Sequence, residues 1–434
     1  MSCIGLAWLS KAKLRTIISS DMRHNLQPRA IECVMSDLLS VTDAEQRIRT
    51  QMPSFGSERL PLDAVMGRVL RQGVRAERDQ PPFDRVMMDG IAIILGDGAI
   101  RSFRREGIQL AGMCGQVLRA PDGCIEVTTG ATLPVGCDCV IPVEQIRREG
   151  DRFALVEDCL PTRRQFVHPQ SSDCHEGAQL LVPGVRIRAP EMAVLAANGV
   201  AEVEVAKLPS VAIIATGDEL ANVDQSLAPG QVRRSNDRAL ATALAARGFN
   251  DVVLTHVPDD LAATKQKLAD LLATRQVLVL SGGVSMGQRD YVPEALRSLG
   301  VREVLHRVAQ RPGKPLWFGI GPQQQVVFAL PGNPLSALVC AVRYLLPALE
   351  QAVGLTASEP MRVALAAAAI THPSLTCFVP VYLHHDATGR ALAQPVPSPT
   401  SGDFSSLPKT HGVVELPPAE IAACAGTAVV FHGW

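Results

Sequence analysis

Three short apolar runs in the middle of the chain each end in a small polar loop that contains glycine. Residues 211–215, 277–280 and 326–330 carry no charged side chain, which is typical of buried parallel strands. In open α/β sheets, ligands bind beyond the carboxyl ends of such strands, where glycine lets backbone N–H groups approach an anion. The pattern therefore predicts a site for a phosphate-bearing ligand. The loop residues expected to form it are Thr216, Gly217, Ser281, Gly282, Gly283, Pro331, Gly332, Asn333 and Pro334.

Carboxylates accompany these loops. Asp218 and Glu219 follow the first run, and Asp290 comes nine residues after Ser281. If all three lie at the same sheet edge, their hard oxygen atoms suit Mg²⁺ that bridges phosphate oxygens, and one of them could orient a water molecule. The structural alternative is that Asp218 caps a turn and Asp290 caps a helix that begins at Tyr291. Their joint position beside three glycine loops favours a metal site.

A second group of candidate residues is basic. The segment 306–315 has the sequence HRVAQRPGKP, which places Arg307 and Arg311 four residues apart. In an extended chain these two side chains would point to the same face, and the Pro-Gly turn would bring Lys314 alongside. Three cations there would clamp an oxyanion, because the planar fork of arginine matches phosphate-like oxygens. The alternative is an ordinary solvated surface, which the apolar residues 316–318 behind the turn make less favourable.

The elements that must position these residues alternate regularly from residue 206 onward. Apolar runs bounded by glycine and proline predict strands, and apolar residues three and four apart predict helices. In one helix Asn236 is the expected N-cap, Leu240 and Leu244 share a face, and Gly248 is the stop. The order of elements predicts a doubly wound α/β domain. Its strands are expected over 211–215, 252–256, 277–281 and 326–330, and its helices over 237–247, 260–273, 292–299 and 335–350.

The flanking segments complete a multidomain α/β fold class. Apolar residues at helical spacing over 36–76 predict helices, with Ser36 and Thr42 as N-caps. Mixed apolar and glycine-rich sequence predicts a β-rich insertion, after which a helix resumes over 191–198. Short apolar runs near the C-terminus predict a small β-domain. The expected domains are an N-terminal extension over 1–34, a helical scaffold over 35–80 and 168–206, a β-rich insertion over 81–167, the α/β domain over 207–354 and the β-domain over 355–434.

Charge and hydropathy argue against two classes of protein. The formal net charge is -1 and the sequence pI is about 6.8, whereas a general nucleic-acid binder would show a basic excess. Hydrophobic residues make up 47% of the chain, yet no run reaches the roughly 18 apolar residues of a membrane span. The longest candidate, 335–355, contains Arg343 and Glu350 and is expected to be a buried helix. We therefore expect neither nucleic-acid binding nor membrane insertion.

The N-terminus and the cysteines indicate a cytoplasmic protein. Residues 4–9 form only a short apolar patch with no basic segment before it, so we expect no secretion signal. Met22 is an alternative start to Met1. Eleven cysteines are scattered along the chain, and one residue separates Cys137 from Cys139, instead of the two of a zinc knuckle. Reduced thiols packed as small apolar groups are the expected state.

Six ordered motifs carry a family resemblance. They are PFDRVMMDG over 82–90, TGATLP over 129–134, TGDEL over 216–220, SGGVS over 281–285, PGKP over 312–315 and LPGNP over 330–334. Each is short, but their order resembles the molybdopterin molybdotransferase (MoeA / gephyrin E-domain) family from about residue 35 to the C-terminus. The resemblance implies an L-shaped homodimer. Each subunit would have a helical scaffold, an inserted β-rich domain, an α/β molybdopterin-binding domain and a C-terminal β-barrel.

The resemblance also implies a reaction and roles for residues. Molybdate would enter the dithiolene of adenylylated molybdopterin, with Mg²⁺-assisted cleavage that releases AMP and molybdenum cofactor. A molybdopterin adenylyltransferase and molybdoenzymes would be the partners. The glycine loops, with Ser285, would hold the substrate. By position in the motifs, Asp89, Thr129, Glu219 and Asp290 would be catalytic, Asp218, Glu219 and Asp290 would bind the metal, Arg307, Arg311, Lys314 and Ser336 would receive molybdate, and Ser401 would lie in a Ser/Gly-rich loop near the cleft.

Two departures from the family pattern keep other functions open. Residues 230–236 are GQVRRSN, so Arg234 stands where many members carry an acidic metal or water ligand. The segment 166–173 keeps the family pattern only at His168, Ser172 and Asp173. One alternative is a non-catalytic paralogue that binds molybdopterin or its cofactor as a carrier or scaffold. Another is the adenylyltransferase of the same pathway, whose domain resembles only the α/β part.

Overall fold

The four predicted parallel strands lie side by side in one sheet. They are β13 (Val211–Thr216), β16 (Val252–Val257), β17 (Val277–Ser281) and β21 (Val326–Leu330), and the sheet order is β16-β13-β17-β21-β20-β18. Strands β20 (Trp317–Ile320) and β18 (Arg302–His306) extend it with antiparallel pairing. Every residue of β13, β17 and β21 is buried, which explains their unbroken apolar sequence. The doubly wound fold class is confirmed.

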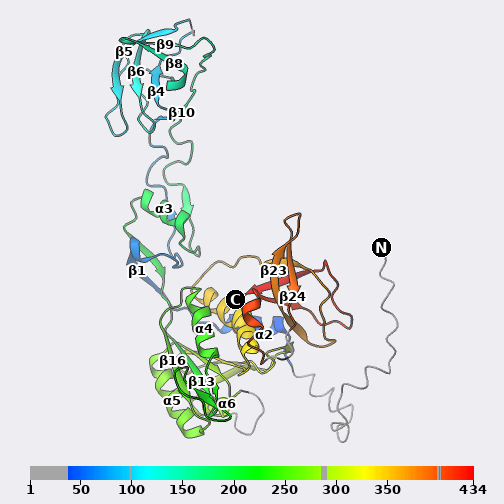
Figure 1. Ribbon diagram of the computed structural model, residues 1–434. Coiled ribbons are helices and arrows are strands. Elements are labelled where there is room, and N and C mark those ends of the chain that lie inside the picture. The colour runs from blue at the N-terminus through cyan, green and yellow to red at the C-terminus, as the bar shows by residue number, and fades with distance from the viewer. Residues whose placement is uncertain (1–37, 98, 285–290, 398–399, 401) are drawn as a thin grey trace, which may run out of the picture. The chain divides into compact units, whose positions relative to one another are not determined.

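The computed structural model describes residues 38–97, 99–284, 291–397, 400 and 402–434, and these fall into two units (Figure 1). One unit contains residues 56–207 together with 354–356. The other contains the α/β domain and the C-terminal β-domain, together with residues 38–55. The predicted domain boundaries stay a prediction.

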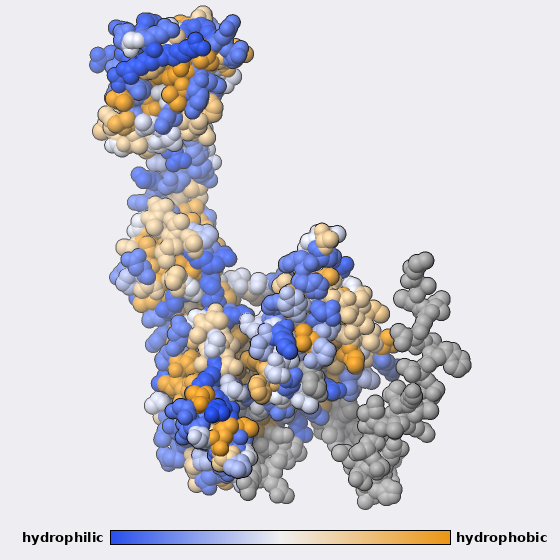
Figure 2. Space-filling model, in the orientation of Figure 1, coloured by the Kyte–Doolittle hydropathy of each residue, from blue (hydrophilic) through white to orange (hydrophobic). Residues whose placement is uncertain are grey.

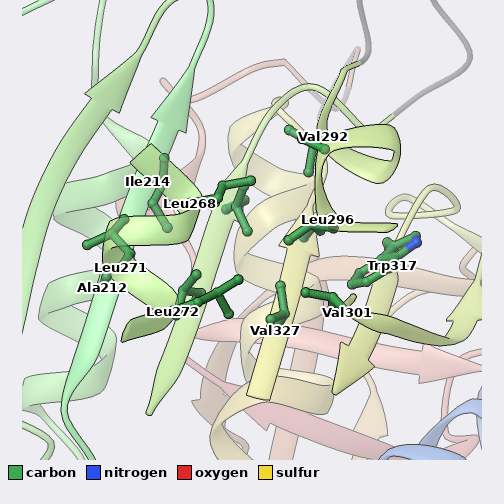
Figure 3. Packing of buried hydrophobic residues seen from close by; sticks show 14 of the residues in the cluster. Ala212, Ile214, Leu268, Leu271, Leu272, Val292, Leu296, Val301, Trp317 and Val327 are labelled. Atoms are coloured by element: carbon green, nitrogen blue, oxygen red, sulfur yellow. The ribbon is translucent and has the colours of Figure 1, made fainter. Parts of the chain in front are cut away.

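Helices cover both faces of the α/β sheet. Helices α5 (Leu261–Thr274) and α6 (Val292–Ser298) bury Leu268, Leu272 and Leu296 against Ile214 and Trp317, as Figure 3 shows. The opposite face is covered by α4 (Asn236–Ala245) and α7 (Pro334–Cys340), which contact β13 and β21. Burial of an aliphatic side chain stabilises the fold by about 1.5–3 kcal/mol. This two-sided core fixes the strand ends that carry the glycine loops.

One helix combines three segments. Helix α7 continues into a π-helical turn, η4 (Ala341–Leu345), and then into α8 (Leu346–Ala352). By length and composition alone this helix could cross a membrane. However, 72% of its most apolar 18-residue stretch is buried within the protein. Arg343 in the π-helical turn is itself buried. The helix is therefore a core element of the α/β unit, as expected for 335–355.

The C-terminal β-domain is a barrel. Its strands are β22 (Arg362–Leu365), β23 (Thr376–His385), β24 (Ala391–Pro395), β25 (Gly412–Leu416) and β26 (Ala428–Gly433). Their order is β23-β24-β22-β26-β25, and a further β23–β25 pairing closes five strands into a ring. Val381, Val414 and Leu416 fill the interior. The short strand β19 (Gln310–Arg311) pairs with β23 and so joins the basic segment to the barrel. A short 3₁₀ helix, η5, spans Leu407–Lys409.

The insertion is β-rich, as predicted, and contains a six-stranded sheet. The order is β7-β4-β6-β5-β9-β8. Its residues alternate between two apolar clusters, one with Ala92 and Val140 and the other with Ile91 and Ile141. On the face drawn in Figure 2, mainly hydrophilic residues with scattered apolar ones cover these strands. The bounds are β4 Gly90–Ile93, β5 Ser102–Gln109, β6 Gly123–Val127, β7 Cys139–Pro142, β8 Ile146–Glu149 and β9 Arg152–Leu155, with a 3₁₀ helix η3 over Val143–Gln145.

The cysteines of this sheet are packed as small apolar groups. Cys124, Cys137 and Cys139 are buried free thiols. Burial raises the pKa of each of these thiols to about 12, so none is a thiolate at neutral pH. This agrees with the expectation of reduced, structural cysteines.

The helical prediction over 36–76 is wrong beyond residue 51. Helix α2 spans Val41–Gln51 and its N-cap is Ser40, so Thr42 lies inside the helix; Ser36 is outside the described residues. The chain is then extended, because proline and glycine interrupt it, and Leu60 pairs with Val203. The apolar residues of this segment pack with residues of β12 and α3 in one core, despite their helical spacing. The elements are β1 Ser57–Pro61 with β12 Glu202–Ala206, η2 Leu62–Ala64, β2 Val74–Arg75 with β11 Gln179–Leu181, β3 Arg85–Val86 with β10 Val167–His168, and α3 Ala189–Ala197.

Candidate active site

The carboxyl ends of β13, β17 and β21 border one cleft of about 1370 Å³. The structure therefore brings the three glycine loops together, as their positions at strand ends predicted. The segment after residue 230 and the start of α4 form another wall, and Gly402 and Phe404 reach the cleft from the barrel. The lining includes Thr216, Gly217, Glu219, Gln231, Arg233, Arg234, Asn236, Asp237, Asp259, Ser281, Gly282, Gly283, Pro315, Pro331, Gly332, Asn333 and Pro334.

Gly282 allows two of the loops to touch. Its φ is +101°, and an added Cβ would lie 2.7 Å from Thr216 Oγ1 and 2.8 Å from the Thr216 carbonyl oxygen. The Gly282 N–H donates to the Leu330 carbonyl at 3.0 Å, which ties the second loop to the third. A Cβ built on Gly332 would lie 3.6 Å from the Gly282 Cα, which is an ordinary contact. At position 282, however, only glycine fits the conformation and the close approach.

Asn236 links the helix wall to two of the loops. Its Nδ2 donates to Ser281 Oγ at 2.9 Å and to the Gly332 carbonyl at 2.7 Å. The expected N-cap role is wrong: Ser235 is the N-cap, and Asn236 is the first residue of α4. Its amide is therefore available to reach across the cleft floor. Sequence reasoning missed this contact because no local signal links positions so far apart in the chain.

Asp218 and Glu219, the two acidic residues after β13, have different surroundings. Glu219 lines the cleft, whereas the Asp218 carboxylate accepts the Asp259 backbone N–H at 3.0 Å and is not among the lining residues. This hydrogen bond joins loops 41 residues apart and is not the local turn cap of the alternative, so the metal role of Asp218 stays a prediction. Asp259 instead lines the cleft, a position that the sequence did not indicate. Within the described residues no three His, Cys, Asp or Glu side chains gather to hold a metal; Asp290 and Ser285 lie outside them.

The basic segment is not extended. Arg307 has a φ of +70°, its N–H donates to the Leu316 carbonyl, and the Val308 N–H donates to the Lys314 carbonyl. The chain therefore folds back on itself, and the expectation that Arg307 and Arg311 share a strand face is wrong. Arg311 and Lys314 are exposed, and the cleft reaches this loop at Pro315.

Buried polar contacts fix the loop from below. Tyr344 Oη donates to Gln310 Oε1 at 2.5 Å, and Gln310 Nε2 donates to the Pro312 carbonyl at 3.0 Å. Gln310 is only 1% exposed. Ser336, predicted to receive molybdate, is buried in α7 and does not line the cleft. Ser401 lies outside the described residues, although its neighbour Gly402 reaches the cleft.

Asp89 and Thr129 contact each other in the unit of residues 56–207. Asp89 Oδ1 accepts both the Thr129 backbone N–H at 2.7 Å and the Thr129 hydroxyl at 2.8 Å. These hydrogen bonds lower the pKa of the Asp89 carboxyl, so it is ionised at neutral pH. The prediction that both residues face the cleft stays a prediction, because the cleft belongs to the other unit.

The segment 166–173 keeps an organised polar cluster. His168 Nε2 lies 2.8 Å from Asp173 Oδ1, and His168 Nδ1 lies 3.0 Å from an Arg85 guanidinium nitrogen. Arg164 binds the Asp84 carboxylate through two nitrogens. The Arg164 side chain is the main cause of the lowered pKa of Asp84. Polar contacts therefore hold this segment in place, although it keeps few residues of the family pattern.

Comparisons with known proteins cover nearly the whole chain. The MoeA N-terminal region (domain I and II) matches residues 39–199, a probable molybdopterin binding domain matches 212–351, and the MoeA C-terminal region (domain IV) matches 362–433. A match of this extent sets aside the adenylyltransferase alternative, which concerned the α/β part alone.

Curated relatives and solved structures agree with this match. A molybdopterin molybdenumtransferase of Synechocystis sp. is 37% identical over 92% of this chain and 100% of its own length. A second one, from Synechococcus elongatus, is 35% identical over 87% of this chain and 94% of its own length. The molybdopterin biosynthesis protein MoeA of Pyrococcus horikoshii superimposes with a TM-score of 0.74 at 27% identity, over 92% of this chain and 100% of its own. The chain therefore belongs to the MoeA family.

Proposed function

We propose that this chain is a molybdopterin molybdenumtransferase of molybdenum cofactor biosynthesis. It would insert molybdate into adenylylated molybdopterin, with release of AMP. The observation that carries the proposal is the convergence of three glycine loops on one cleft of about 1370 Å³, inside the segment that matches a molybdopterin binding domain. This volume exceeds that of a typical small-ligand pocket, as an adenylylated pterin requires.

The loops supply binding and orientation. The Gly217 and Gly282 N–H groups already donate to the Val257 and Leu330 carbonyls, so the other backbone N–H groups of these loops would meet the phosphate oxygens. Asn236 connects two of these loops through its hydrogen bonds to Ser281 and Gly332. Preorganised donors of this kind stabilise charge without rearrangement during the reaction.

We propose Mg²⁺ as the cofactor of this cleft. Glu219 and Asp259 line it, and their carboxylates are the hard oxygen donors that this ion takes. Bound there, Mg²⁺ would neutralise phosphate charge and polarise the bond to be broken. Molybdate would be received at the exposed loop of Arg311 and Lys314. Asp89, which is ionised, would act as a hydrogen-bond or proton acceptor.

The proposal extends to assembly and partners. A homodimer in the cytoplasm would take its substrate from a molybdopterin adenylyltransferase and pass the product to molybdoenzymes. The carrier alternative is favoured by one observation, the presence of Arg234 in the cleft wall. A carrier would bind the substrate without turnover.

Genetic rescue separates these functions. The chain is expressed in a bacterial strain that lacks its own molybdenumtransferase, and the activity of an endogenous molybdoenzyme is measured. The transferase proposal predicts restored activity. Absence of rescue by a well-expressed, folded protein that still binds adenylylated molybdopterin would support the carrier function instead.

A further inference from the structure

We propose that Arg234 is a phosphate-binding residue, which contacts the anionic part of the ligand directly at the cleft wall. The inference rests on the proposed function, because it names a recognition element of the same site. It starts from the position of Arg234 in the lining of the cleft, beside the first turn of α4.

A small ribbon fixes the backbone of Arg234. Strand β14 (Leu220–Ala221) pairs in parallel with β15 (Val232–Arg233). The Val232 N–H donates to the Glu219 carbonyl at 2.9 Å, and the Arg234 N–H donates to the Ala221 carbonyl at 2.9 Å. Arg234 therefore leaves the ribbon at a defined point next to the glycine loop after β13.

Among the described residues, the side chain of Arg234 has one charged partner, Asp237, and a donor that makes no hydrogen bond. It is 12% exposed, and its Nε lies 3.4 Å from Asp237 Oδ2. That Nε is buried and makes no hydrogen bond to any described residue. Because the Nε has almost no exposed surface, the terminal guanidinium nitrogens are the donors that would meet a phosphate in the cleft. The neighbouring Arg233 differs, because its guanidinium donates to the carbonyls of Val223 and Gln225.

The charge immediately around Asp237 favours an anion, while Glu219 and Asp259 add negative charge elsewhere in the cleft lining. Asp237 is fully buried and lies between two arginines, with Arg238 Nη1 at 3.3 Å from its carboxylate. One negative charge thus faces two positive charges at the N-terminus of a ten-residue helix, whose dipole adds further positive potential. A phosphate group in the cleft would restore the balance through the planar fork of Arg234.

Arg238 offers a matched control. It pairs with the same carboxylate at nearly the same distance, but it is 41% exposed and does not line the cleft. Replacing either arginine removes one partner of Asp237. Only replacement of Arg234 also removes a cation from the cleft.

Binding of inorganic pyrophosphate and of AMP to the full-length protein tests the proposal. Isothermal titration is carried out with Arg234→Gln, Arg234→Lys and Arg238→Gln, in EDTA and again in Mg²⁺. We expect Arg234→Gln to weaken pyrophosphate binding about tenfold or more in EDTA, since hydrogen bonds to charged groups are strong. Arg238→Gln should stay within about twofold of the wild type. Arg234→Lys should fall between, because it keeps the charge and loses the fork.

Equal affinities of Arg234→Gln and Arg238→Gln would overturn the proposal. If Arg234→Gln does not fold, as judged by circular dichroism, Arg234→Lys decides, and wild-type affinity in that variant would contradict a bidentate contact. The measurement needs no turnover. Loss of AMP release with intact Arg234-dependent binding would therefore overturn the transferase proposal and leave this inference standing.

Discussion

Arg343 and Glu415 form a buried ion pair between the π-helical turn of the α/β domain and the barrel, with Nε 2.8 Å from Oε2. Arg343 also contacts Glu45 of α2 at 2.7 Å, and Glu415 accepts from His432 at 2.9 Å. One arginine thus joins three elements that are distant in sequence. These contacts hold the barrel beside the domain that carries the cleft.

Replacing Arg343 with Met should destabilise this unit strongly. Two carboxylates would lose their shared partner, and breaking a buried ion pair in this way costs about 3–5 kcal/mol. Thermal unfolding followed by circular dichroism measures the effect. Arg247→Met is the control, because Arg247 pairs with Glu350 at 38% exposure and such a pair contributes about 0–1 kcal/mol. Equal losses in both variants would show that the Arg343 network is not specifically stabilising.

Glu415 should make this stability depend on pH. Burial raises the pKa of Glu415, but the hydrogen bond from His432 and the charge of Arg343 outweigh it and lower the pKa below 4.5. A depressed carboxyl pKa gives stability that is present above the unfolded pKa and is lost as the pH falls through the folded value. The melting temperature of the wild type should therefore drop below pH 4.5. Glu415→Gln should be less stable at pH 7 and show a smaller acid-induced drop; identical pH profiles would contradict this assignment.

Gly282→Ala should abolish ligand binding in the cleft. The added Cβ would meet Thr216 at 2.7 Å in a backbone conformation, φ +101°, that costs an L-residue about 1–3 kcal/mol. Gly389→Ala is the control, since Gly389 has a φ of +82° with nothing within 4 Å of an added Cβ. Both variants should lose some stability, but only Gly282→Ala should lose AMP binding by titration. Retained binding in Gly282→Ala would show that the loops do not form the ligand site.

Asp290→Asn tests a residue that lies outside the described part of the chain. The change keeps the size of the side chain and removes its charge, so a metal or water ligand would be lost. We expect a large loss of turnover with only a modest loss of substrate binding. Unchanged turnover would show that Asp290 is only a helix cap.

The sequence predicted the elements whose signals are local. Residues 211–216 and 326–330 are strands because unbroken apolar runs suit the centre of a parallel sheet, and Leu240 and Leu244 face the core as their spacing indicated. Strand β18 was missed because three of its five residues are polar, and β20 was missed because it has only four residues. The helix expected near Leu60 became a strand because pairing with β12 outweighed helical spacing.

The site could be predicted only in part for the same reason. Glycine loops at strand ends signal a cleft from local sequence, so the three loops were found. Contacts between distant positions give no such signal: Asn236 reaches Ser281 and Gly332, which lie 45 and 96 residues further along the chain. The turn at Arg307 likewise depends on hydrogen bonds to Lys314 and Leu316. Tertiary structure therefore decided which polar residues face the cleft.

Release of AMP from adenylylated molybdopterin tests the central claim most directly. Purified protein is mixed with adenylylated molybdopterin and Mg²⁺, with and without molybdate, and AMP and molybdenum cofactor are quantified by chromatography. The transferase function predicts AMP release that depends on both molybdate and protein, together with an equal amount of cofactor. Tight substrate binding with no AMP above a protein-free blank would contradict it.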